Sequence, residues 1–152
     1  MRDFDRPLDA AGRADAEAMG AAVAAAGYVA ARVLCSTARR ARETLEGLCR
    51  HSGIDGGRAI FLDGLYTEDA HGYLGLVQRH GGTLASLLVV GHNPMTEDLA
   101  TALAGSGEAG ARAAIVGGFP TSGLAVIRFD GGISSAAPGA GHLEAFLTPA
   151  DL

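Results

Sequence analysis

Apolar residues recur along this chain with two different periods, and segments of the two kinds alternate. Spacings of three and four residues, typical of helices buried on one face, occur over 10–26, 39–50 and 70–79. Short apolar runs typical of strands fall at 32–36, 59–62, 86–90 and 123–129. The alternation predicts an α/β fold with three layers, in which helices cover both faces of a mostly parallel central sheet.

Residues at the segment ends support these boundaries. Asp9 suits the N-cap of the first helix and Gly27 its C-terminal end, while Pro94 suits the first turn of a further helix that ends near Leu103. The predicted buried stripes of the three long helices are Ala16, Met19 and Val23; Ala41, Leu45 and Leu48; and Tyr73, Leu74 and Val77.

The remaining segments carry weaker signals. The run Ser86–Val90 is apolar on both faces and predicts a central parallel strand that is covered on both sides. Residues 105–118 are rich in Gly and predict a flexible connector, 134–141 predict a loop, and the tail 143–152 returns apolar residues to the core. We find no internal repeat and no linker, so residues 1–152 are expected to form a single domain.

Composition excludes several classes of function. The net charge of −5 gives no reason to expect binding to nucleic acid or to an anionic membrane. Cys35 and Cys49 lie far apart without a C-x-x-C pattern, which argues against a zinc site or a disulfide framework. Neither a long apolar span nor a signal-like start is present, so we expect a soluble, cytoplasmic protein.

The motif V-V-G-H-N-P at 89–94 is the first candidate for chemistry. Gly91 permits a tight approach, and His92 leaves the carboxyl end of a strand just before a helix begins. Ligands of open α/β sheets bind beyond the carboxyl ends of strands, and helix N-termini attract anions. His92 is therefore placed to donate to a phosphate; the alternative is a histidine that only caps or packs the loop.

The motif S-T-A-R-R-A-R-E-T at 36–44 occupies an equivalent position after another strand. Ser36 and Thr37 suit the helix cap, with Glu43 closing it. Three arginines, Arg39, Arg40 and Arg42, crowd the first turn, where the helix dipole disfavours positive charge. An anion near this turn would explain them, since arginine grips phosphate with two parallel hydrogen bonds. Solvated arginines on an exposed face are the alternative.

Two further motifs are expected to be coincidental. Arg79-His80-Gly81 precedes a strand, so His80 should lie at the opposite end of the sheet from His92, with Gly81 just past the helix. The G-x-G-x-x-G run formed by Gly105, Gly107 and Gly110 is interpreted as a loop, because a dinucleotide fingerprint needs a strand before it and a helix after it. His51, His71 and His142 have no motif around them and are expected at the surface.

Together the motifs resemble the histidine phosphatase (phosphoglycerate-mutase-like) superfamily, and within it the small SixA-like phosphohistidine phosphatases. The matching segments lie in family order across nearly the whole chain: R-D-F-D-R-P-L (2–8), V-L-C-S-T-A-R-R-A-R-E-T (33–44), L-Y (65–66), V-V-G-H-N-P (89–94), F-P-T-S-G-L-A-V (119–126) and P-A-D-L (149–152).

The resemblance implies roles for particular residues. Arg40 corresponds to the second arginine that grips the phosphoryl group, and His92 to the second active-site histidine, which stabilises the charge of the transition state. Asn93 and Gly91 correspond to the loop around that histidine. Glu68, which follows Leu65-Tyr66, is a candidate for the acid that protonates the leaving group. The family chemistry implies no metal and no other cofactor.

The resemblance also implies that a part of the site is missing from this sequence. The nucleophilic histidine of the family lies in an R-H-G or R-H-A segment after the first strand, shortly before the counterpart of R-D-F-D-R-P-L. Here that motif begins at Arg2. We therefore expect the first strand and the nucleophile to be absent from these 152 residues, which would bind phosphate without turning it over. A start site placed too late and a degenerate pseudo-phosphatase are the two explanations.

The expected ligand is a phosphohistidine-bearing protein or a small phosphate ester. A non-catalytic phosphate-binding module is the main alternative, and a phosphatase of small phosphometabolites is the second. In the family the first strand is central in the sheet, so its absence predicts lower stability or a homodimer that fills the gap.

Overall fold

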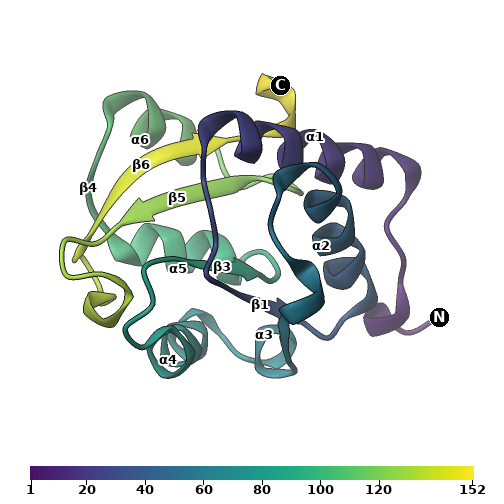
Figure 1. Ribbon diagram of the computed structural model, residues 1–152, viewed down its shortest axis with the longest axis horizontal. Coiled ribbons are helices and arrows are strands. Elements are labelled where there is room, and N and C mark those ends of the chain that lie inside the picture. The colour runs from purple at the N-terminus through teal and green to yellow at the C-terminus, as the bar shows by residue number, and fades with distance from the viewer.

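The computed structural model describes residues 1–152 and has the predicted α/β alternation (Figure 1). Its elements are α1 (Ala10–Ala26), β1 (Arg32–Ser36), α2 (Arg39–Ser52), β2 (Ile60–Leu62), α3 (Gly64–Thr67), α4 (Ala70–Gly81), β3 (Leu87–Val90), α5 (Met95–Leu103), β4 (Ala104–Gly107), α6 (Ala109–Val116), β5 (Leu124–Arg128) and β6 (Gly141–Leu147). Short 3₁₀ helices include Asp3–Asp5 near the N-terminus.

The first helix begins and ends as its sequence predicts. The Asp9 carboxylate accepts the Gly12 N–H at 2.7 Å, and Gly27 ends the helix in the left-handed conformation at φ 77°. α1 then packs against α2 at a glycine, since a Cβ on Gly20 would lie 2.3 Å from the Leu48 carbonyl oxygen. The predicted buried stripes of α1, α2 and α4 are all buried.

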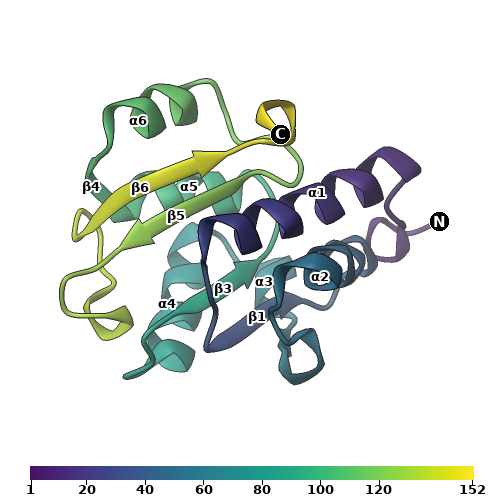
Figure 2. The ribbon, with the colours of Figure 1, turned by 45° about the horizontal axis from the view of Figure 1, so that its top comes forward.

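The first sheet has the order β2-β1-β3, and all of its strands are parallel. Successive residues of β1 face opposite sides, as the two-residue period of a strand requires. Val33 and Cys35 pack toward α2, whereas Leu34 packs toward α4 and α5. Helices therefore cover both faces of this sheet (Figure 2).

The second sheet has the order β4-β6-β5, with β6 parallel to β4 and antiparallel to β5. One expectation was wrong here, and another was confirmed, since the tail buries Leu143 and Phe146. Residues 105–118 are not a flexible connector but contain most of β4 and all of α6. The tail reaches the core as part of β6, the central strand of this sheet, which was not predicted as a strand. β4 has the sequence Ala-Gly-Ser-Gly, which contains no apolar pattern typical of a strand. It forms a strand because it pairs with β6.

The glycine run also has a different context from the one expected. Gly105 and Gly107 lie in β4 and Gly110 in α6, so a strand does precede a helix. Gly105 and Gly107 nevertheless serve packing, because a Cβ on Gly105 would lie 2.0 Å from the Gly139 carbonyl oxygen and one on Gly107 would lie 2.9 Å from the Leu143 Cβ. The N-cap of α6 is Glu108, whose carboxylate is the wrong charge beside a pyrophosphate.

Histidine 142 takes part in the same sheet instead of lying free at the surface. Its Nδ1 lies 2.8 Å from Ser106 Oγ on β4, and its Nε2 lies 3.2 Å from a Glu108 carboxylate oxygen. This chain of hydrogen bonds ties β6 to β4 and to the start of α6.

The strand β3 lies at an edge and not at the centre of its sheet. β1 is the central strand, and all four residues of β3 are only half-buried. In Figure 2, β3 and β5 lie on the facing edges of the two sheets, and no strand pairing joins them. Side chains of both strands, Val89 and Ile127 among them, pack on one apolar cluster. Two unpaired strand edges therefore border the same core.

Candidate active site

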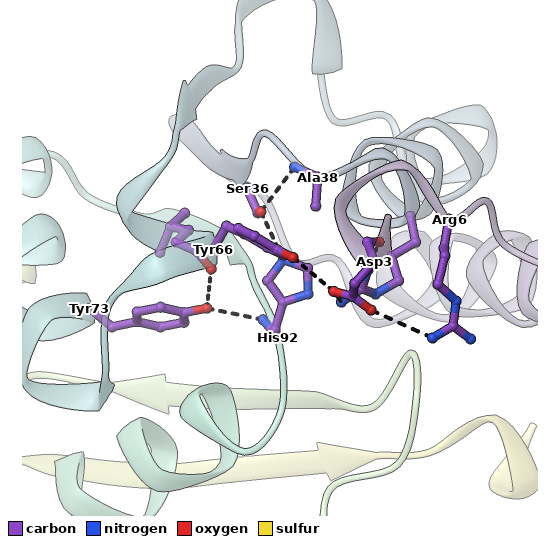
Figure 3. Close-up of polar contacts among 9 residues, drawn as sticks. Asp3, Arg6, Ser36, Ala38, Tyr66, Tyr73 and His92 are labelled. Carbon is purple, nitrogen blue, oxygen red and sulfur yellow. Dashed lines mark hydrogen bonds and ion pairs between the residues drawn. The ribbon is translucent and has the colours of Figure 1, made fainter. Parts of the chain in front are cut away.

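Two strand ends bring the site together. β1 ends at Ser36 and β3 at Val90, and the carboxyl ends of parallel strands meet at the same edge of a sheet. His92 Nε2 lies 2.8 Å from Ser36 Oγ, which joins the two predicted motifs directly (Figure 3). Ser36 is fully buried. Its role differs from the helix cap that the sequence suggested, because the N-cap of α2 is Ala38.

The backbone of His92 is fixed by a buried tyrosine. The Tyr73 hydroxyl accepts the His92 N–H at 3.1 Å and donates to the Leu65 carbonyl oxygen. Gly91 allows this arrangement, since a Cβ there would lie 2.7 Å from the Tyr73 ring. The tight approach predicted at Gly91 is thus the close contact of its backbone with the Tyr73 ring.

The imidazole of His92 is half-buried. Burial lowers its pKa from the ordinary value of 6.5, and the nearby positive charge of Arg40 lowers the pKa further, while the Asp3 carboxylate raises it. The lowered pKa favours the neutral form of His92 at pH 7. With Nε2 bonded to Ser36, Nδ1 is the ring nitrogen without a hydrogen-bond partner in the protein.

Asn93 links the His92 loop to the second sheet. Its Nδ2 donates to the Phe119 carbonyl oxygen at 2.7 Å, and its Oδ1 accepts the Thr96 hydroxyl. The amide of Asn93 is therefore engaged at both ends within the protein. Its contacts hold the loop beside the segment that leads into β5.

Arg40 lies in the first turn of α2 and is the one arginine of its cluster that reaches toward His92. Arg39 pairs with Glu43 at 3.3 Å, and Arg42 Nε donates to the Thr37 carbonyl oxygen at 3.0 Å. Arg40 instead bonds to Asp3, through Nη1 to the backbone oxygen at 2.8 Å and through Nη2 to a carboxylate oxygen at 3.1 Å. Carboxylates of the protein itself thus neutralise Arg39 and Arg40, whereas Arg42 bonds to a backbone carbonyl.

Two residues at the site were not identified from the sequence as functional. The Tyr66 ring meets the His92 ring edge to face, at 5.4 Å between centroids, and its hydroxyl donates to Asp3 Oδ2 at 2.9 Å. That hydrogen bond is the main cause that lowers the pKa of Asp3. Asp3 and Tyr66 lie in segments that the resemblance matched, but only their contact with Arg40 and His92 reveals a role.

No side-chain hydrogen bond or ion pair joins the other candidates, Glu68 and His80, to this cluster. The Glu68 side chain is exposed at the end of α3, lies against Gly72 and makes no ion pair. His80 lies in the last turn of α4, and its carbonyl oxygen accepts Arg32 Nη1 at 2.6 Å. Because Arg32 begins β1 and Ser36 ends it, His80 and His92 lie at opposite ends of the sheet.

No group of three or more His, Cys, Asp or Glu side chains is arranged to hold a metal ion. None of the helices has both the length and the apolar character that crossing a bilayer requires.

Comparison with known proteins places this chain in a family. Residues 2–65 match the family model of the histidine phosphatase superfamily (branch 1). An uncharacterized protein of Mycobacterium tuberculosis is 39% identical over 98% of this chain and 92% of its own length.

Solved structures of similar fold support the same family. The structure assigned to phosphohistidine phosphatase SixA from Agrobacterium tumefaciens has a TM-score of 0.78 and 36% identity, over 98% of this chain and 87% of that one. The protein histidine phosphatase SixA complexed with tungstate shares the fold, with a TM-score of 0.78 at 24% identity over 99% of this chain and 88% of that one. By its motifs, its fold and these relatives, the chain belongs to the histidine phosphatase superfamily, in its SixA-like group.

Proposed function

We propose that the site formed by Arg40 and His92 binds the phosphoryl group of phosphohistidine-bearing proteins, in the manner of the SixA phosphatases. The observation that carries the proposal is the hydrogen bond between His92 Nε2 and Ser36 Oγ, at 2.8 Å. It joins the two strand-end motifs and leaves Nδ1 of His92 free, while the Arg40 charge is close enough to lower the pKa of His92.

The directions of the hydrogen bonds support anion binding by a neutral histidine. The Ala38 N–H donates to Ser36 Oγ at 3.2 Å, so the Ser36 hydroxyl proton is available to Nε2 of His92. In that tautomer Nδ1 carries the proton of the imidazole and can donate it to a phosphoryl oxygen. Arg40 adds charge-assisted donors on a rigid fork. Both contacts become stronger as negative charge gathers on the phosphoryl oxygens.

Hydrolysis through a phosphohistidine intermediate needs a second histidine. Its nitrogen would form a bond to phosphorus while the bond to the leaving nitrogen breaks, and water would then release phosphate. Of the five histidines, only His92 lies at the site, and His80 lies at the far end of the sheet. We therefore propose that this 152-residue polypeptide binds the phosphoryl group without turning it over.

The binding proposal is tested by calorimetric titration with tungstate, a phosphate analogue that a SixA structure contains. Arg40→Met and His92→Gln should each weaken binding about tenfold, because each removes one donor to the anion. His80→Gln is the matched control and should bind like wild type. Equal affinity in all four proteins would refute the proposed site.

The turnover proposal has its own test. The polypeptide should release no phosphate from a phosphohistidine protein; steady release that His92→Gln abolishes would contradict it. Reading the coding DNA in frame upstream of Met1 then separates the two explanations. An apolar strand followed by Arg-His-Gly or Arg-His-Ala there would support an active phosphatase, and a stop codon would support a phosphate-binding module.

A further inference from the structure

The guanidinium of Arg40 already holds an anion. Asp3 accepts Nη1 with its backbone oxygen at 2.8 Å and Nη2 with Oδ2 at 3.1 Å. The same Oδ2 accepts the Tyr66 hydroxyl at 2.9 Å, and Oδ1 pairs with Arg6 Nη1 at 3.5 Å. Figure 3 shows the Asp3 carboxylate between Tyr66 and Arg6, beside the His92 ring.

This set of donors is the kind that a phosphoryl group requires. Two guanidinium groups and a hydroxyl, from the N-terminal segment, α2 and α3, converge on two carboxylate oxygens. Hydrogen bonds of this type lower the pKa of Asp3, with the Tyr66 hydroxyl as the largest cause, so the carboxylate is ionised at neutral pH. Asp3 thus presents a negative charge where an oxyanion would otherwise be.

A bound phosphoryl group and Asp3 would compete for Arg40. Bidentate binding of phosphate uses the fork of the guanidinium, and both terminal nitrogens of Arg40 are directed at Asp3. The two negative groups would also repel each other across the site.

The segment that carries Asp3 is held without any buried residue of its own. The 3₁₀ helix Asp3–Asp5 contains no buried residue, and the Asp3 side chain is 51% exposed. Phe4 contacts the Tyr66 ring edge to face, at 5.1 Å between centroids. Exposed ion pairs of this kind contribute little to stability, so an incoming dianion can replace this one.

We propose that Asp3 is a resident carboxylate at the phosphoryl position, that a phosphorylated ligand must displace it, and that the ligand then takes over the Tyr66 and Arg6 donors. The inference rests on the proposed function and adds a gate to the same site, namely the Asp3 carboxylate that the ligand must displace. It assigns Tyr66 and Arg6 to anion binding beside Arg40 and His92, and it makes the N-terminal segment a competitor of every ligand.

Tungstate titration of Asp3→Asn against wild type and Asp5→Asn tests the gate. Asp5 is the matched control, because its carboxylate lies in the same 3₁₀ helix and bonds to Arg2 only. Asp3→Asn should bind tungstate about tenfold more tightly, since a competing negative charge is removed. Asp5→Asn should bind like wild type.

A second pair of variants tests the transfer of donors. In the Asp3→Asn background, Tyr66→Phe should weaken tungstate binding about fivefold, because the hydroxyl then serves the ligand. Equal or weaker binding by Asp3→Asn, with wild type still binding, would overturn the gate and leave the proposed function standing. Absence of binding in both folded proteins would overturn the proposed function, and the gate with it.

Discussion

Burial and the guanidinium of Arg40 lower the pKa of His92, while the Asp3 carboxylate acts in the opposite direction. The pKa of this imidazole therefore depends on the balance between its two charged neighbours, Arg40 and Asp3. It also matters for the binding chemistry, because a neutral His92 donates from one ring nitrogen only, and that nitrogen is Nδ1 when the Ser36 hydroxyl donates to Nε2.

Two substitutions should move the titration of His92 in opposite directions. Arg40→Met removes a positive charge and should raise the pKa of His92, whereas Asp3→Asn removes a negative charge and should lower the pKa further. NMR titration of the His92 ring measures both, and wild type should titrate below 6.5. A pKa that stays the same in both variants would mean that neither charge acts on the imidazole.

Sequence reasoning found the residues at the strand ends but not their partners. Arg40 and His92 stand out because each follows a strand and precedes or begins a helix, where anion sites form. Tyr66 and Asp3 carry no such local signal. Their hydrogen bond joins residues that are 63 positions apart, so only the tertiary fold places them together.

Elements with a strong apolar stripe were predicted well, whereas those made by pairing were not. α1, α2 and α4 each bury the stripe that their sequence shows. β4 and α6 were missed because Ala and Gly dominate 104–116, and such residues carry almost no contrast between a buried and an exposed face. β6 was not predicted as a strand, because it forms by pairing with β4 on one side and with β5 on the other.

The packing of β3 against α4 should be sensitive to a single methyl group at Gly91. In Gly91→Ala the new Cβ would lie 2.7 Å from the Tyr73 ring, so the ring that holds the His92 N–H must shift. We expect a loss of about 1–3 kcal/mol in the free energy of unfolding, measured in urea, together with weaker tungstate binding.

Gly75→Ala is the control for that substitution. A Cβ at Gly75 meets nothing within 4 Å, and the residue lies inside α4. Alanine there should leave the stability unchanged or raise it by about 0.5–1 kcal/mol, since glycine is the weaker helix former. Equal losses in the two variants would show that the close approach to Tyr73 has no special cost.

At the scale of the whole molecule, the two unpaired edges of β3 and β5 are the main weakness of the fold. Each strand bonds to a neighbour on one side only, and apolar side chains from both reach the same core cluster. Unpaired strand edges recruit other strands, and they leave backbone donors without protein partners. We therefore expect a chain of low stability, or a homodimer in which a second copy covers these edges.

Hydrogen exchange at several protein concentrations distinguishes these states. In the monomer, amides of β3 that point away from β1 should exchange much faster than amides of the central strand β1. In a dimer the same amides should gain protection as the concentration rises, and light scattering should report twice the mass. A monomer in which β3 and β5 are as protected as β1 would contradict the open edges, because every outward amide would then need a partner within one chain.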